Sequence, residues 1–158
     1  TNANLRYANL KNTNLENVNL TGADLFCAKL ANIKYNEQTA FFALCCPEEG
    51  AFIAYKKASL KKISCSGKAA VIVKILVTED AKRSSATTRK CRCSKAKVLS
   101  ITSIDGQTEF SKAYSYRDCN FVYRVGEIVE VNDFDENRWN ECSTGIHFFV
   151  TRDEAVNY

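Results

Sequence analysis

Residues 1–34 decide the fold of the first part of the chain and read TNANLRYANLKNTNLENVNLTGADLFCAKLANIK. Leucine recurs at every fifth position of this stretch, with a small or β-branched residue two positions before it and, in most units, an asparagine or aspartate between them. A helix repeats every 3.6 residues and a strand every two, so a period of five predicts a coil in which every fifth side chain points inward. The repeated leucines are Leu5, Leu10, Leu15, Leu20, Leu25 and Leu30.

This pattern resembles the pentapeptide-repeat family, whose A-(D/N)-L-x-x units wind into a four-sided, right-handed β-helix. The resemblance implies a short β-helix over residues 1–35, with about four units to a coil, followed by a connecting or capping segment over residues 36–46. Because stacked repeats need neighbours to bury their faces, we expect the natural protein to continue upstream of Thr1. The outward positions are not acidic, which disfavours the mimicry of duplex DNA seen in some relatives and favours a stalk or spacer.

The composition is that of a globular protein, with 158 residues of which 46% are hydrophobic and 25% charged. The chain has no apolar run of the roughly 18 residues that a membrane span needs and no signal peptide, so we expect a cytoplasmic protein without a membrane partner. The net charge of +4 is unevenly distributed: residues 1–55 carry −1, residues 56–97 carry +11 and residues 98–158 carry −6. Either the basic and acidic parts neutralise each other on folding, or the basic part binds an anion.

Beyond Pro47, the only proline, we expect a compact α+β domain over residues 47–158. Thr151 and Glu154 have the spacing of a capping box and predict a helix from Thr151 to Tyr158. A second helix start is predicted at Thr78-Glu79-Asp80, and a turn at Ser66-Gly67-Lys68. The almost wholly apolar run Ala69–Val77 should be central in a sheet. The expected strands are Phe52–Lys57, Ala69–Val77, Lys97–Ser103, Asn120–Arg124, Glu127–Val131 and Ile146–Val150.

Eight cysteines without export signals are interpreted as reduced thiols, mostly buried as small hydrophobic residues. A zinc site of Cys91, Cys93, Cys142 and His147 is the weaker alternative, because structural zinc sites seldom use a Cys-x-Cys pair and the chain has one histidine. We therefore predict no metal and no other cofactor.

Two polar segments are the candidate binding site. Residues 81–95 interleave fixed cations with hydroxyls, and both groups donate hydrogen bonds that phosphate or carboxylate can accept. Residues 139–149 hold the only tryptophan, a glycine and the only histidine. Together they predict a pocket for a small, nucleotide-like anion, although a solvated loop paired with the acidic third of the chain is the alternative. The proposed donors are Lys82, Arg83, Ser84, Ser85, Thr87, Arg89 and Arg92, with Trp139 and His147 lining the pocket.

Catalysis is a separate hypothesis, with Glu141 and His147 as an acid–base pair. Strand alternation places His147 on the same face as Phe149, which favours a half-buried histidine instead. Trp139 either closes the domain or stacks on a base, where it could be joined by Tyr114, Tyr116 and Tyr123. Duplex nucleic acid is the less favoured partner because the chain carries no familiar nucleic-acid-binding motif.

The runs Arg-Ser-Ser-Ala-Thr (83–87) and Glu-Cys-Ser-Thr-Gly-Ile-His-Phe-Phe (141–149) carry a second resemblance. They look like a domain of unknown function that follows pentapeptide repeats in tailed-bacteriophage proteins, which implies a phage origin and the cytoplasm of an infected host. The leading hypothesis is a non-enzymatic phage accessory protein that binds a small anionic ligand or a host protein, for example to sequester a host defence nucleotide. A nucleotide-processing enzyme and a protein–protein adaptor are the alternatives, and an oligomer is compatible with each.

Overall fold

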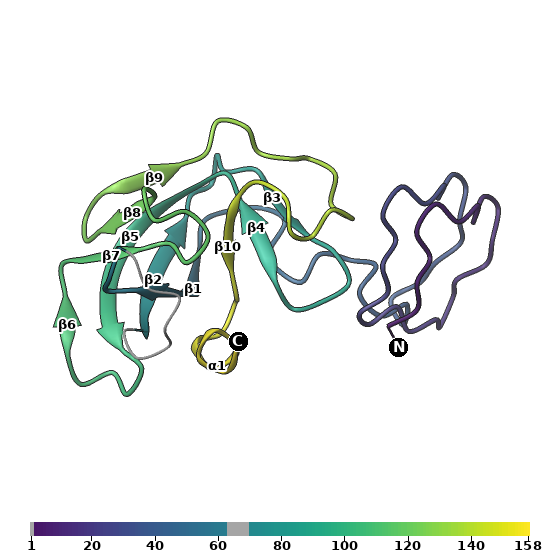
Figure 1. Ribbon diagram of the computed structural model, residues 1–158. Helices are drawn as coiled ribbons and strands as arrows, with labels where there is room; N and C mark the ends of the chain where they lie inside the picture. Colours follow the sequence, from purple (N-terminus) through teal and green to yellow (C-terminus); the bar gives the residue numbers. More distant parts are fainter. Residues whose placement is uncertain (1, 63–69) are drawn as a thin grey trace.

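The computed structural model of the chain describes residues 2–62 and 70–158, in which a coil formed by the repeats lies beside a β-rich domain (Figure 1). The turn expected at Ser66-Gly67-Lys68 and the first residue of the strand expected at Ala69–Val77 lie outside the described residues. The described part contains one helix, of six residues, and no helix there is long and apolar enough to cross a membrane.

The repeat segment winds back on itself every twenty residues. Parallel bridges join Asn4 to Asp24, Asn9 to Lys29 and Asn14 to Lys34. Four five-residue units therefore complete one coil, in agreement with the expected number. The next bridge joins Asn19 to Ala40, so the winding continues past the last regular unit with one extra residue.

Each unit turns a corner by means of two residues. The asparagine or aspartate lies at the bridge, and its side-chain oxygen accepts the amide hydrogen of the residue two positions on, as in Asn14 to Glu16 (2.9 Å) and Asp24 to Phe26 (3.0 Å). The corner itself is a residue with positive φ three positions after the bridge residue, where asparagine is the side chain that tolerates the left-handed conformation best. These corners are Tyr7, Asn12, Asn17, Gly22, Cys27 and Asn32.

The leucines fill the interior of the coil, which confirms the inward-facing fifth position. Leu20 and Leu25 are 4% and 1% exposed and pack with Ala23 in the centre of the coil. Trp139 of the following domain packs against the same cluster, so the coil does not form its core alone.

The domain is built on a curled antiparallel sheet in the order β6-β5-β2-β1-β7-β8, with β9 pairing the outer edge of β5. β2 is central, as the apolar run predicted. Residues 125–127 join β8 to β9 and so connect the two ends of the sheet (Figure 1). The strands of this sheet are β1 (Phe52–Ser59), β2 (Ala70–Val77), β5 (Lys95–Ser103), β6 (Glu109–Phe110), β7 (Lys112–Tyr114), β8 (Val122–Arg124) and β9 (Ile128–Glu130).

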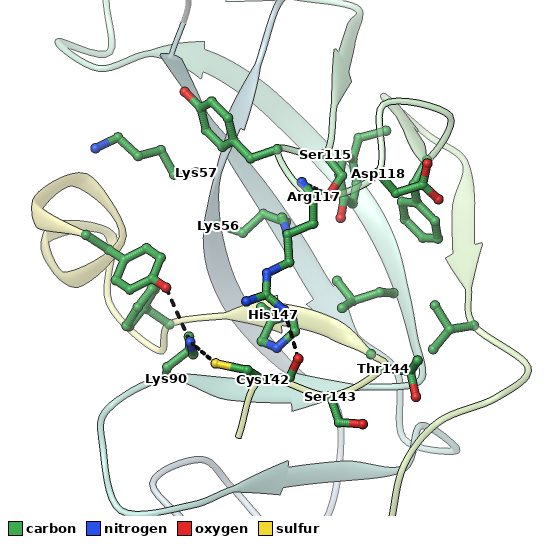
Figure 2. Close-up of a pocket in the computed structure, with 18 of the residues that line it drawn as sticks. Lys56, Lys57, Lys90, Ser115, Arg117, Asp118, Cys142, Ser143, Thr144 and His147 are labelled. Atoms are coloured by element: carbon green, nitrogen blue, oxygen red, sulfur yellow. Dashed lines mark hydrogen bonds between the residues drawn. The ribbon is translucent and has the colours of Figure 1, made fainter. Parts of the chain in front are cut away.

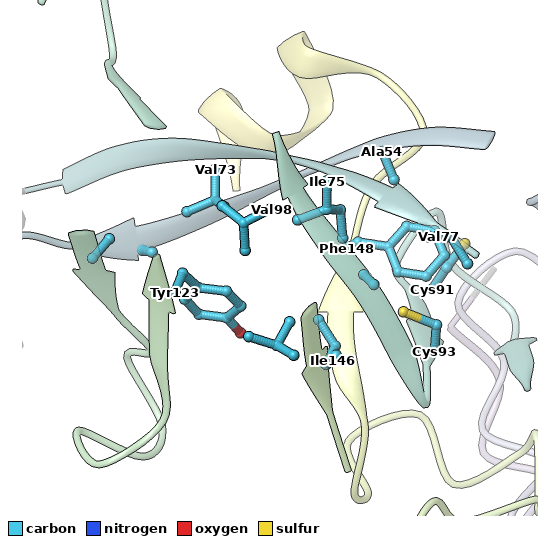
Figure 3. Packing of buried hydrophobic residues seen from close by; sticks show 14 of the residues in the cluster. Ala54, Val73, Ile75, Val77, Cys91, Cys93, Val98, Tyr123, Ile146 and Phe148 are labelled. Atoms are coloured by element: carbon cyan, nitrogen blue, oxygen red, sulfur yellow. The ribbon is translucent and has the colours of Figure 1, made fainter. Parts of the chain in front are cut away.

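A smaller antiparallel sheet of β3 (Arg83–Ser85), β4 (Cys91–Cys93) and β10 (Ile146–Phe148) packs against the larger one. Ile75, Val98, Tyr123 and Phe148 lie between the two sheets and are at most 1% exposed (Figure 3). The helix α1 (Arg152–Asn157) covers the opposite face of the large sheet, where Ala155 packs with Ile72 and Phe149.

Two sequence-based expectations require correction. No helix begins at Thr78-Glu79-Asp80, because Ala81 donates to the Thr78 carbonyl oxygen (3.0 Å) in a single turn that leads directly into β3. The domain is also more strongly β than an α+β fold, since the described part holds only α1, which does begin with the predicted Thr151–Glu154 capping box. The six expected strands are present with ends that coincide or differ by at most two residues, whereas β3, β4, β6 and β7 were not anticipated.

Candidate functional site

Arg83 was expected to bind an anion, but its guanidinium donates hydrogen bonds to main-chain carbonyl oxygens instead. It donates to the carbonyl oxygens of Gly50 (2.6 Å) and Thr78 (2.8 Å), with longer bonds to three others, and stacks on the ring of Phe52 at 5.2 Å. These contacts join β3 to the chain segments on either side of β1 and β2. The donors of Arg83 are therefore part of the scaffold.

Arg92 is 2% exposed and occupied in the same way. Its guanidinium donates to the carbonyl oxygens of Thr144 (2.6 Å), Asp135 (2.9 Å) and Asn137 (3.1 Å), and it stacks on Phe134 at 5.1 Å. A single side chain from β4 thus holds the loop that precedes β10.

The hydroxyls of the basic segment are buried rather than presented to a ligand. Ser85 accepts the amide hydrogen of Cys45 (2.8 Å), and Thr87 donates to the carbonyl oxygen of Ala23 in the repeat coil. The Thr87 carbonyl in turn accepts from Gly22 (2.7 Å), so this residue attaches the coil to the domain. The hydroxyl of Ser84 is buried without a partner in the described part of the chain.

The two remaining predicted cations form exposed ion pairs with the acidic third of the chain. Lys82 pairs with Glu136, and Arg89 donates to Glu154 at 2.6 Å. Trp139 is also engaged, because it packs on Phe42 and the repeat core and lies beneath the Arg138 guanidinium at 4.4 Å. The structure therefore brings the predicted residues to several places: Lys82 and Arg83 line a cavity of about 480 Å³, and His147 lines a separate cavity of about 830 Å³.

That cavity lies at the open edge of β1. Tyr55 exchanges main-chain hydrogen bonds with Phe149 (2.7 and 2.8 Å), and Ser59 pairs with Tyr114 of β7. Lys57 lies between these two attachments, where this edge of β1 has no partner strand in the described chain, while the other edge pairs with β2. The gap opens into a cavity of about 830 Å³, closed by the β7–β8 loop on one side and by residues 142–147 on the other (Figure 2).

Four cationic residues line this cavity, although the Lys57 side chain extends away from the other three towards the end of α1 (Figure 2). They come from three different parts of the chain: Lys56 and Lys57 from β1, Lys90 from the segment before β4, and Arg117 from the β7–β8 loop (Figure 2). Asp118 and Asp133 are its acidic lining residues. The remaining walls alternate hydroxyls with apolar and aromatic groups, namely Ser115, Tyr116, Phe121, Tyr123, Val131, Cys142, Ser143, Thr144, Gly145, Ile146, Phe149 and Tyr158.

The cations differ in how fully they are engaged. Lys57 donates to the Val156 carbonyl oxygen at the end of α1 (3.0 Å). Lys90 donates to the Tyr158 hydroxyl (3.2 Å) and contacts the Cys142 sulfur (3.4 Å); burial opposes its charge, but these two neighbours outweigh burial and its pKa is raised. Arg117 gives one bond to the Cys142 carbonyl oxygen (2.8 Å), and the rest of its fork has no partner among residues 2–62 and 70–158.

His147 is half-buried on the cavity wall, as strand alternation predicted, with Ile146 and Phe148 turned into the core. Its Nε2 lies 3.2 Å from the main-chain oxygen of Glu141 and must be the donor there. Burial, helped by the charge of Lys56, lowers the pKa of His147 to about 4, so the ring is neutral at physiological pH. The Glu141 carboxylate does not face the ring but accepts from the Thr88 hydroxyl, so the two groups do not form the acid–base pair considered from the sequence.

The family model for pentapeptide repeats matches residues 1–34, and the model described as "Family of unknown function (DUF5758)" matches residues 42–155. The second match covers most of the chain. The protein belongs to the DUF5758 family. No curated protein and no solved structure matches the chain.

Within the DUF5758 domain, the sheet register separates the residues considered as zinc ligands. His147 is paired with Arg92, whereas Cys91 and Cys93 are paired with Phe148 and Ile146 and share their face of the sheet, inside the core. Burial also raises the pKa of Cys93 to about 12, which keeps this thiol protonated. The cysteines that the structure describes are free thiols, and no metal-binding cluster of His, Cys, Asp or Glu occurs among those residues.

The cationic residues of this candidate site that sequence reasoning missed are Lys56, Lys57, Lys90 and Arg117. Lys56 carried the one available signal: it falls on the inward side of the strand pattern, between Ala54 and Ala58, where a lysine is rarely found. Nothing local marks Arg117, which reaches the cavity only because the β7–β8 loop folds over it.

Proposed function

We propose that the protein binds a small anion in the cavity at the open edge of β1. The observation that carries this proposal is that four cationic residues from three chain segments line one cavity, against two carboxylates. A surface held together by ion pairs would instead place a carboxylate on each cation, as Lys82 and Arg89 show elsewhere. The ligand class is the one that the basic segment suggested, but the binding site is a different one.

The size and lining of the cavity support a ligand that carries both an anionic group and a flat or apolar part. A volume of about 830 Å³ accommodates a molecule as large as a nucleotide. Arg117 has a planar fork available for a phosphate or carboxylate, whereas the hydroxyls of Ser143 and Thr144 already donate to Asp135 and to the Asp133 carbonyl oxygen. Phe121 and Tyr116 supply apolar surface beside them.

The wider setting belongs to the same proposal. In it, the repeat segment is a right-handed β-helix that presents the DUF5758 domain, and the protein acts as a bacteriophage accessory protein that retains a host nucleotide. Supporting observations are the twenty-residue winding of the coil and its attachment to the domain through Gly22, Thr87 and Trp139.

Thermal shift and titration calorimetry against ATP, cyclic nucleotides and pyrophosphate test the binding. We expect Arg117→Gln to weaken binding about tenfold or more, since a charge-assisted hydrogen bond contributes about 1.5–3 kcal/mol. Arg124→Gln removes an equally exposed arginine from β8, which does not line the cavity, and should leave affinity unchanged. If Arg89→Gln lost binding and Arg117→Gln did not, the ligand would bind at the basic segment rather than in this cavity. If no anion stabilised or bound the wild type, the proposal would be refuted.

The fate of the ligand distinguishes retention from catalysis. A bound nucleotide recovered unchanged after heat denaturation supports retention. A chemically altered product would instead favour the nucleotide-processing enzyme, with His147 as the neutral base on the cavity wall.

A further inference from the structure

Lys56 differs from the other cations of the cavity because its side chain is buried on the inward side of β1. It is 8% exposed and lies in the inward row of β1 between Ala54 and Ala58, which are both fully buried. Buried lysines are almost always paired with a carboxylate. In the described part of the chain Lys56 has neither an ion pair nor a hydrogen bond, and its Nζ lies 5.2 Å from the ring centroid of Tyr123.

The three cavity lysines differ in what their amines contact. Lys57 and Lys90 both donate to oxygens, at the end of α1 and at Tyr158. The Lys56 amine instead meets an aromatic face, the cavity and the nearby Arg117 charge. An amine that is desolvated and close to another cation loses its proton easily, and a neutral amine is a nucleophile.

We propose that the Lys56 amine forms a reversible imine with the carbonyl group of a small anion, of the 2-oxo-acid or phosphorylated-aldehyde class, bound in this cavity. This inference rests on the proposed function, because it requires the anion to occupy the same site. Arg117 holds the carboxylate or phosphate of the ligand with the free part of its fork.

The reaction needs no further reagent. The lone pair of Lys56 Nζ attacks the carbonyl carbon, the C–O π electrons move to oxygen, and a proton passes from nitrogen to that oxygen to give a carbinolamine. Loss of this oxygen as water then forms the C=N bond. His147 is suited to carry the proton, because its Nε2 donates to the Glu141 carbonyl and leaves Nδ1 as an acceptor.

The surroundings of Lys56 favour the neutral amine. Burial, helped by the Arg117 charge and opposed by Cys93 on β4, lowers the pKa of Lys56 to about 8. The other titratable groups that line the cavity are Tyr116, Asp118, Tyr123, Asp133, His147, Lys57, Lys90, Cys142 and Tyr158. Imine formation should therefore increase with pH about a midpoint near 8.

Pyruvate and lactate form a matched pair of probes, since they are similar in size and charge and only pyruvate has a carbonyl. The full chain is incubated with each in cyanoborohydride, which reduces an imine to a stable amine, and peptides are mapped by mass spectrometry. We expect pyruvate to label Lys56 about tenfold or more faster than exposed Lys112, because a lowered pKa leaves far more neutral amine at pH 7.5. Lactate should give no label and should slow labelling by pyruvate.

Lys56→Arg keeps the positive charge and removes the nucleophile, and Lys56→Met provides an uncharged variant of similar length in case the arginine does not fold. Either folded variant should lose the label. Calorimetry should still detect pyrophosphate in Lys56→Arg, which keeps the positive charge at this position, and should detect weaker pyrophosphate binding in Lys56→Met, which removes it. Anion binding without preferential labelling of Lys56, or labelling spread evenly over exposed lysines, would overturn the imine and leave anion binding standing. If neither probe nor pyrophosphate binds the wild type, the proposed function fails and the imine fails with it.

Discussion

The guanidinium of Arg92 donates a 2.6 Å hydrogen bond to the main-chain oxygen of Thr144, which lies fifty-two residues later in the chain. Bonds to Asp135 and Asn137 complete the contact, and Gly145 packs close to the Arg92 side chain, where a Cβ would lie 3.2 Å from Arg92 Cβ. Arg92 therefore shapes the loop that forms one wall of the cavity, while its own donors are occupied by main-chain oxygens.

Replacing Arg92 should mainly affect stability. Arg92→Met keeps the length of the side chain but leaves three carbonyl oxygens without their donor, and we expect the free energy of unfolding to decrease by about 3 kcal/mol. Urea unfolding followed by circular dichroism measures the change. Arg124→Met, at an exposed position on β8, is the control and should stay within about 0.5 kcal/mol of wild type. If Arg92→Met unfolded with the same free energy as wild type, the loop before β10 would be shown to be stable without these hydrogen bonds.

The buried imidazole of His147 predicts a pH dependence of stability. Its pKa in the folded protein is lowered to about 4, whereas an unfolded histidine titrates near 6.5. Between these values the unfolded chain binds a proton that the folded chain does not, so stability should decrease as the pH falls from about 6.5 to 4, by at most about 1.4 kcal/mol per pH unit.

Unfolding free energies measured between pH 7 and pH 4.5 for wild type and His147→Gln test this dependence. The variant should show a flatter profile over that window, since carboxylates such as Asp135, whose pKa is lowered by a hydrogen bond from Ser143, act at lower pH in both proteins. Identical pH dependence of stability in the two proteins would mean that folding does not lower the pKa of His147.

The interior of the coil should be as sensitive as that of the domain. Leu25 is 1% exposed, and Leu25→Ala is expected to cost about 3 kcal/mol through lost burial and the cavity left behind. Because the only tryptophan, Trp139, packs on the same cluster, its fluorescence should report the loss directly. Lys29→Ala, on the outside of the coil, should leave both stability and emission unchanged, and an equal effect of the two substitutions would contradict the inward placement of leucine.

The capping box of α1 gives a smaller prediction. The Thr151 hydroxyl accepts the Glu154 amide hydrogen and the Glu154 carboxylate accepts the Thr151 amide hydrogen. Thr151→Ala should reduce the free energy of unfolding by about 1 kcal/mol in urea titrations, whereas Thr151→Ser should preserve it. Equal loss in both variants would point to the methyl group rather than the hydroxyl.

The elements that sequence reasoning predicted are those with local signals. The leucine period requires no knowledge of tertiary structure, and neither does the Thr151–Glu154 spacing or the apolar run of β2. By contrast, β3 and β4 have three residues each, which is too short for a period to show.

The hydrogen-bond partners of the basic segment, residues 81–95, come from parts of the chain that are far away in the sequence. In the sequence, Arg83 and Arg92 cannot be told from arginines that bind phosphate. In the structure their guanidinium groups donate to main-chain carbonyl oxygens up to fifty-two residues away. The cavity has the same origin, because its walls combine β1, the β7–β8 loop, residues 142–149 and Tyr158. Pattern and composition therefore suggested an anionic ligand but did not show which cations would have donors left over for one.

The winding of the coil has a consequence for how such chains can vary in length. Since four units complete a turn, insertion of one unit ahead of Gly22 would leave the leucine core intact but rotate all preceding outward side chains by a quarter turn about the coil axis. Insertion of twenty residues would restore their direction. Relatives that differ by single units would thus display the same surface residues at a different angle to the DUF5758 domain, which makes unit number a means of reorienting a surface without redesigning it.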